Sequence, residues 1–314
     1  MSVRRCWRPV LAAALAALVA SHTAAQQVSL VFAGDTTLDD DAGALIARGG
    51  DPLAPFAALF AGADLRIANL ECVVATTGKA GSKNYTFRAH PRVLPVLRRH
   101  LDGVTLANNH SGDYGREAFA EMLGLLKQAG LAQAGGGMNL AQAHTPWMVE
   151  RHGLRIAILS YNEFMPRSFE ADFDAPGIAW SEDEQVVDDI RRARSVHRAD
   201  VVIPIMHWGW EEPVANARQR ALAKLMIDAG ADAVVGGHPH QLQDTEAYKG
   251  KPIFYSLGNF VFEGFSDPIH NVAWAVRLEL DRQGVRSWQA HEIQIDRAGL
   301  PHAGKQPVQR VTLR

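Results

Sequence analysis

Cysteine is scarce in this sequence of 314 residues, which contains two of them. Cys6 lies in the N-terminal segment and Cys72 is alone in the remainder, so the folded part lacks a cysteine pair for a disulfide. The sequence has no apolar run of about 18 residues or more, which argues against a membrane-spanning polymer synthase subunit. Low-complexity tracts and repeats of solenoid length are also absent. The 34 acidic and 32 basic residues nearly balance, and this charge gives no basis for a nucleic-acid partner.

The N-terminal segment carries positive charge followed by a short apolar run. Arg4, Arg5 and Arg8 precede apolar residues 10–20, and small residues follow a polar break up to Ala25. This pattern is typical of an export signal cleaved near Ala25, and a short helix of the folded domain is the alternative. The sequence predicts an exported protein of the periplasm or cell envelope, through either general or twin-arginine secretion. Cleavage would leave 29 basic and 34 acidic residues, a formal charge of −5.

Strand-like and helix-like segments alternate along most of the chain. Apolar, β-rich runs predict buried strands at 28–33, 65–70, 103–107, 155–160, 201–206 and 233–236. Helical spacing of apolar residues predicts helices at 116–129, 182–196 and 215–229. This alternation favours an α/β sheet of largely parallel strands with helices outside.

The final part of the sequence has a different pattern. Strand-like runs follow one another at 245–248, 252–257, 272–280 and 288–295. They predict a second, mixed or antiparallel sheet that packs on the first. Because no linker separates the two parts, we expect one domain from residue 26 to 314.

Five of the predicted buried strands end in clusters of polar residues. These clusters are GD at 34–35, NLE at 69–71, NNH at 108–110, HWG at 207–209 and GHPH at 237–240. Ligands of open α/β sheets bind outside the carboxyl ends of the strands, so we expect the clusters to converge in space.

The converging side chains are those of a mixed nitrogen and oxygen metal site. The candidate ligands are Asp35, Glu71, Asn109, His207, His238 and His240. Such a set suits one or two divalent transition metal ions, Mn, Zn or Fe, and two carboxylates can bridge ions about 3.5–4 Å apart. Taken singly, each residue also has a structural interpretation, such as a helix cap for Asp35. The repeated placement at strand ends favours the metal site.

The ordered motifs of the chain resemble a known family. They are GD (34–35), NLEC (69–72), YTFR (85–88), ANNH (107–110), DYG (113–115), HWG (207–209), GHPH (237–240) and YSLGNF (255–260). In this order they resemble the bacterial CapA family of capsule or poly-γ-glutamate synthesis proteins, related to calcineurin-like metallophosphoesterases, over about residues 28–265. The resemblance implies a four-layer α/β/β/α sandwich of two mixed sheets.

The resemblance also distributes roles over two metals. It implies Asp35 and His240 at the first metal, Glu71 as the bridge, and Asn109, His207 and His238 at the second metal. His110 would be the general acid that protonates the leaving group, a role that suits an imidazole.

Two departures from the related phosphoesterases concern the number of metals. Those enzymes open with an Asp–x–His pair, whereas Thr36 and Thr37 follow Asp35 here. They also bridge with an Asp where this chain has Glu71. The sequence therefore leaves a one-metal and a two-metal centre open.

Three further residues are candidates for substrate binding or for support of the ligands. Arg88 offers a planar fork of donors for a phosphate or carboxylate, or a surface ion pair. Glu211, four residues after His207, can orient an imidazole. Asn259 follows an apolar run and is either a substrate or ligand contact or a turn residue.

Two functions of different classes fit this sequence. The first is an exported metal-dependent hydrolase of capsule or poly-γ-glutamate synthesis, acting on a phosphoester or an anionic polymer, with envelope polymer-synthesis machinery as a partner. The second is a non-catalytic envelope module that binds or anchors an anionic capsule polymer and keeps a structural metal. The missing histidine after Asp35 favours the second, and the presence of His110, which a structural metal does not need, favours the first.

Overall fold

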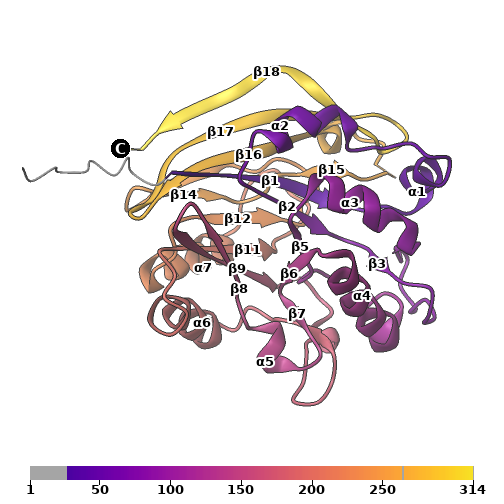
Figure 1. The fold of residues 1–314 in the computed structure, drawn as a ribbon, viewed down its shortest axis with the longest axis horizontal. Coiled ribbons are helices and arrows are strands. Elements are labelled where there is room, and N and C mark those ends of the chain that lie inside the picture. Colours follow the sequence, from indigo (N-terminus) through magenta and orange to yellow (C-terminus); the bar gives the residue numbers. More distant parts are fainter. Residues whose placement is uncertain (1–26, 264, 314) are drawn as a thin grey trace, which may run out of the picture.

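The computed structural model describes residues 27–263 and 265–313 (Figure 1). The predicted export signal and its cleavage position near Ala25 lie outside the described residues. None of the helices in these described ranges has both the length and the apolar character that crossing a bilayer requires.

The first sheet has eight strands in the order β18-β17-β16-β1-β2-β5-β6, with β15 paired to β1. Strands β1, β2, β5 and β6 are parallel, whereas β16, β17 and β18 continue the sheet in antiparallel fashion. The strand bounds are β1 Val28–Thr36, β2 Leu65–Leu70, β5 Gly103–Thr105, β6 Ala132–Ala134, β15 Asn259–Val261, β16 Val272–Asp281, β17 Gly284–Ile295 and β18 Pro301–Thr312.

The second sheet has six strands in the order β13-β14-β12-β11-β9-β8. Its four central strands are parallel and its two edge strands are antiparallel. The strand bounds are β8 Trp147–Arg151, β9 Leu154–Asn162, β11 Val201–His207, β12 Val234–Gly237, β13 Thr245–Tyr248 and β14 Lys251–Phe254. Two small pairs, β3 (Val73–Val74) with β4 (Arg88–Ala89) and β7 (Gly136–Gly137) with β10 (Gly177–Ile178), lie outside both sheets.

Helices cover the outer faces of the two sheets. Their bounds are α1 Asp40–Ala47, α2 Ala57–Ala61, α3 Leu94–His100, α4 Gly115–Ala129, α5 Leu140–Ala143, α6 Asp183–Ser195 and α7 Ala217–Ala229. Local chemistry fixes the ends of two predicted helices. Helix α7 begins with a capping box, in which Asn216 and Gln219 satisfy each other's backbone amides, and α4 ends at Gly130 in a left-handed conformation.

Three apolar cores separate four layers. Side chains such as Phe32 and Ile67 of the first sheet meet Ile203 and Phe254 of the second sheet in the central core. Helices α1 to α4 pack on the outer face of the first sheet, and α6 and α7 pack on the outer face of the second. Each fully buried large side chain contributes about 1.5–3 kcal/mol to these cores. The predicted α/β/β/α sandwich of two mixed sheets is confirmed.

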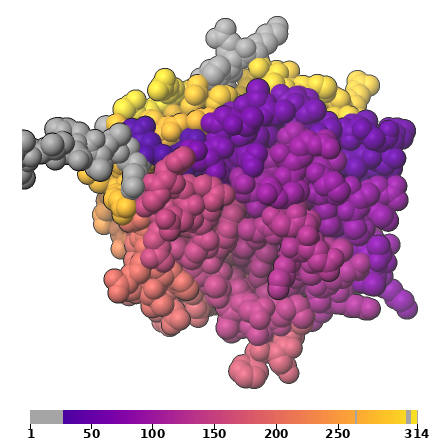
Figure 2. Space-filling model, viewed as in Figure 1, coloured from indigo at the N-terminus to yellow at the C-terminus, as the bar shows by residue number. Residues whose placement is uncertain are grey.

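The prediction of which strands form which sheet was wrong. The C-terminal strands do not form one sheet: β13 and β14 belong to the second sheet, whereas β16 pairs antiparallel with β1, with Val28 opposite Leu280, and extends the first sheet. The alternating strands divide instead: β1, β2 and β5 belong to the first sheet, and β9, β11 and β12 to the second. Figure 1 shows the yellow C-terminal strands beside the indigo β1, and Figure 2 shows them along one edge of the filled surface.

Candidate metal centre

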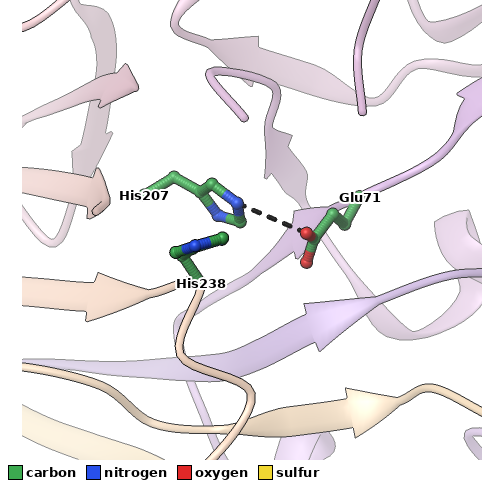
Figure 3. A group of neighbouring side chains, drawn as sticks. All are labelled: Glu71, His207 and His238. Carbon is green, nitrogen blue, oxygen red and sulfur yellow. Dashed lines mark ion pairs between the residues drawn. The ribbon is translucent and has the colours of Figure 1, made fainter. Parts of the chain in front are cut away.

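The carboxyl ends of strands from both sheets meet at one place. Asp35 lies in β1, Glu71 directly follows β2, and Asn109 follows β5 of the first sheet. His207 ends β11 and His238 directly follows β12 of the second sheet. Figure 3 shows Glu71 approaching the two imidazoles from the opposite side. The structure therefore brings together the clusters that the sequence placed at strand ends.

Two groups of potential ligands share one carboxylate. In the first group, ligand atoms of Glu71, His207 and His238 all lie within 4.8 Å of one another. In the second group, atoms of Asp35, Glu71 and His240 meet the same limit. All five side chains are buried. This arrangement fits two cation positions with Glu71 between them.

Unsatisfied polar atoms at the centre fit a cation. Among the described residues, neither carboxylate oxygen of Glu71 and neither ring nitrogen of His238 has a hydrogen-bond partner. His207 Nε2 lies 3.3 Å from Glu71 Oε1, but its short contact of 2.6 Å is with Asn109 Oδ1. A buried polar group without a partner costs about 1–3 kcal/mol, and coordination to a divalent cation would remove that cost.

The electrostatics of the centre also fit a cation. Burial and the nearby Asp35 carboxylate raise the pKa of Glu71 well above its usual range. Burial lowers the pKa of His207 to about 3 and places the pKa of His238 well below its usual range. Neutral imidazoles are the form that binds metals, and a bound cation would favour the ionised form of Glu71.

Backbone and side-chain donors fix the Asp35 carboxylate. Asp35 Oδ1 accepts a hydrogen bond from Asn69 Nδ2 at 2.8 Å, and Oδ2 accepts one from the backbone amide of His238 at 2.9 Å. A Cβ atom at Gly237 would lie 2.6 Å from Asp35 Oδ1, so only glycine permits this approach of β12 to β1. The GHPH motif thus places its glycine against the candidate metal ligand Asp35.

Two histidines adopt an uncommon backbone conformation. His238 has φ of 94° and His240 has φ of 56°, both in the left-handed region that residues other than glycine rarely adopt. Such strain persists where the surrounding structure imposes it, and it gathers at functional sites. The reversal turns both rings inward, so that His238 joins one ligand group and His240 the other.

Amide side chains orient two imidazoles. His207 contacts Asn109 Oδ1 at 2.6 Å and Asn69 Nδ2 at 3.3 Å, and His240 Nδ1 contacts Asn259 Oδ1 at 2.8 Å. Asn259 pairs with Asp35 across β15 and β1, which explains how the YSLGNF segment reaches the centre. The structure therefore places Asn259 against a candidate ligand.

His110 lies beside the ligands and carries its own acidic partner. Its Nε2 is 4.0 Å from Glu71 Oε1, and its Nδ1 is 2.7 Å from Asp113 Oδ2. Lys83 lies 2.5 Å from the other oxygen of Asp113. Burial lowers the pKa of His110 to about 4, and Asp113 partly opposes this effect. The ring is therefore neutral at pH 7 until a further negative charge approaches it.

Two predicted residues lie farther from the ligands. The Arg88 guanidinium donates to the carbonyl oxygens of Thr77 and Gly78, stacks on Tyr114 and lines a pocket together with Asp39 and Asp40. Glu211 is exposed and lines the cavity above His238. The imidazoles described above contact amides and other carboxylates rather than Glu211.

The sequence did not assign roles to three residues that support the centre. Asn69 and Asp113 orient Asp35 and His110, and both stand inside motifs, which is the signal that could have identified them. Phe164 covers the His238 ring at a centroid distance of 3.7 Å. It follows β9 in a segment without a recognisable motif.

Comparison with protein families assigns the chain to one of them. The family model for the bacterial capsule synthesis protein PGA_cap matches residues 29–264. The chain therefore belongs to this family of bacterial capsule synthesis proteins.

Three curated proteins illustrate the relationship. The chain is 32% identical to the PGA biosynthesis protein CapA of Bacillus subtilis, over 75% of this chain and 62% of that protein. It is 37% identical to the capsule biosynthesis protein CapA of Bacillus anthracis, over 51% of this chain and 40% of that protein. It is 32% identical to a probable polyglutamine synthesis accessory protein of Mycobacterium tuberculosis, over 64% of this chain and 57% of that protein. The chain thus spans less than two thirds of the length of these relatives.

Solved structures show weaker likeness. The NAD nucleotidase NadN of Haemophilus influenzae has a TM-score of 0.49 at 14% identity, over 89% of this chain and 60% of that chain. The sulfate thiohydrolase SoxB of Thermus thermophilus has a TM-score of 0.48 at 15% identity, over 80% of this chain and 42% of that chain.

Proposed function

We propose that this protein is an exported hydrolase of capsule or poly-γ-glutamate synthesis that uses two divalent transition metal ions, Mn, Zn or Fe. Its substrate is a phosphoester or an anionic polymer, and envelope polymer-synthesis machinery is its partner. The observation that carries the proposal is the buried set of ligand atoms on Glu71 and His238 that lack hydrogen-bond partners among the described residues. A structural role alone gives no reason to bury these atoms unpaired.

The ligands divide between the two ions as their distances suggest. Glu71, His207 and His238 would hold one ion, with Asn109 beside it, and Asp35, Glu71 and His240 would hold the other. When bound, divalent cations polarise a phosphoryl or carbonyl oxygen and lower the pKa of water. Asn69, the backbone amide of His238 and Asn259 hold the ligand side chains in place before the substrate arrives.

His110 would transfer a proton to the leaving group. Asp113 accepts the Nδ1 hydrogen of the ring and directs Nε2 toward the centre. A negatively charged substrate group beside Nε2 would raise the pKa of the ring, so that it gains a proton on binding and releases it as the bond breaks.

The test is a screen of phosphoesters and γ-glutamyl polymers with Mn, Zn or Fe, followed by His110→Ala. We expect turnover to fall by about 10²–10⁴-fold while the metal content stays unchanged. The matched control is His302→Ala, because His302 is an exposed histidine of β18 that pairs with Asp296. Equal turnover in wild type and His110→Ala would contradict the role of His110.

A non-catalytic module with one structural metal is the second candidate. The observation in its favour is that Thr36 and Thr37, in place of a histidine near Asp35, donate to the backbone carbonyls of Gly34 and Val261. This candidate predicts one metal equivalent, no turnover in the screen and polymer retention that His110→Ala leaves unchanged.

A further inference from the structure

The metal centre opens into a cavity whose chemistry restricts the substrate. The cavity has a volume of about 810 Å³, and Asn109, His110, His238 and His240 line it. His238 is 2% exposed, and both its ring nitrogens lack hydrogen-bond partners among the described residues. A substrate therefore reaches the candidate ligands through this cavity, and the cavity wall contacts the part of the substrate next to its reacting group.

The wall nearest the centre is apolar. Phe164 lies 3.7 Å from His238, and Phe87 lies 4.4 Å from His110, measured between ring centroids. Phe262 lies 4.5 Å from the ring of His240. Phe265 lies 5.0 Å from the ring of His240, and Tyr85 also lines the cavity. A strongly hydrated group beside the reacting atom would lose its water against these rings without gaining hydrogen bonds.

The charged residues on the wall are mostly acidic. Asp40, Glu211 and Glu263 line the cavity, and among the described lining residues Lys83 is the one lysine or arginine. The Lys83 ammonium lies 2.5 Å from the Asp113 carboxylate and donates to the Asn109 carbonyl oxygen, so its charge is already matched. The exposed Glu211 carboxylate has no hydrogen bond or ion pair to any described residue.

The pocket next to this cavity does not reverse the excess of acidic residues. It has a volume of about 530 Å³ and shares Asp40 and Tyr85 with the cavity. Arg88 and Arg92 line it together with Asp39 and Asp40, so most of its positive charge is offset. Burial, and after it the neighbouring Asp40, raises the pKa of Asp39 to about 7.

We infer that the cavity accepts a phosphoester whose organic part is apolar and neutral or cationic, and excludes a polyanionic chain. The inference rests on the proposed function and selects the phosphoester from its two substrate classes. The reacting phosphoryl group would carry the only negative charge, at the metal centre. Glu211 and Glu263 would then favour a cationic end and repel an anionic one.

The test uses three aryl phosphates that differ at the para position: trimethylammoniomethyl, ethyl and carboxymethyl. Phosphate release by the protein loaded with Mn²⁺ gives kcat/KM. Calorimetry with the three matching arylphosphonates, which are not hydrolysed, gives Kd without turnover. We expect the anionic compound to be about tenfold poorer than the neutral one in both assays, the effect of about 1.4 kcal/mol of repulsion. Glu211→Lys should reduce this ratio, and Glu184→Lys, an equal charge change at an exposed position of α6, should leave it unchanged.

The outcomes separate this inference from the proposed function. Phosphonate binding in the expected order without any hydrolysis would support the cavity and contradict the hydrolase. Hydrolysis with no charge preference would support the hydrolase and overturn the inference. Binding of a γ-glutamyl oligomer as tight as that of the neutral phosphonate, or no phosphonate binding at all, would also overturn it.

Discussion

Replacement of Glu71 by glutamine removes the ionisable carboxyl, whose charged form only a bound cation favours, and keeps the shape of the side chain. In the metal-free protein, both Glu71 oxygens lack hydrogen-bond partners among the described residues, and burial and Asp35 raise the pKa of the carboxyl. We therefore expect Glu71→Gln to raise the free energy of unfolding of the metal-free protein by about 1–3 kcal/mol. For a chain of this size, each kcal/mol corresponds to roughly 2 °C in Tm.

Bound metal should reverse the order of thermal stability of the wild type and Glu71→Gln. An ion present at about 100 times its Kd stabilises the wild type by about 2.7 kcal/mol for one site. Glu71 belongs to both ligand groups, so the glutamine variant should lose most of this gain at both positions. The variant should thus have the higher Tm without metal and the lower Tm with it.

Thermal unfolding measures this reversal in Tm. Both proteins are stripped of metal with a chelator and then titrated with Mn²⁺ or Zn²⁺. Glu184→Gln, at an exposed position of α6, is the matched control and should follow the wild type under both conditions. The reasoning would be refuted by a Glu71→Gln variant that is destabilised without metal and keeps the full metal-dependent rise in Tm.

Four further predictions concern Asp113, Gly237, Gly124 of α4 and the pH dependence of stability. Asp113→Asn should lower kcat by about 10–100-fold with metal content unchanged, because it frees the His110 ring from its partner, and phosphate release with elemental analysis measures both quantities. Gly237→Ala should lower the free energy of unfolding by roughly 1–3 kcal/mol and weaken metal binding, because the new Cβ would lie 2.6 Å from Asp35 Oδ1. Gly124→Ala in α4, where nothing lies within 4 Å, should instead stabilise by up to about 1 kcal/mol in urea unfolding. The metal-free protein should lose stability as the pH falls from about 6.5 toward 4, because burial lowers the pKa of His110 to about 4 and that of His207 to about 3, so that the unfolded chain binds these protons first. The raised pKa of Glu71 opposes part of this loss. Unchanged urea midpoints at pH 7 and 5 would argue against the prediction.

Much of the fold was predictable because its strands are short apolar runs with clear ends. The run 201–206 became β11 (Val201–His207), and the helical spacing at 116–129 became α4 (Gly115–Ala129). The assignment of strands to sheets was not predictable in this way. Pairing of β16 with β1 depends on contacts between residues about 250 positions apart, which periodicity within a segment does not encode.

The candidate site was likewise predictable in some respects and not in others. The placement of Asp35, Glu71 and His207 at strand ends was sufficient to predict that they converge, because parallel strands bring their carboxyl ends to one edge. The left-handed conformation of His238 and the contact of Phe164 with its ring were not predictable, because both depend on how the loops after β12 and β9 fold over the centre. These loops also determine the charge of the cavity wall.

Elemental analysis of the purified protein tests the central claim of a two-metal centre most directly. We expect about two equivalents of Mn, Zn or Fe in the wild type. His238→Ala should lose the ion held with Glu71 and His207 and retain close to one equivalent. Absence of metal from the wild type after loading with each of these ions, or equal content in the two proteins, would contradict the account.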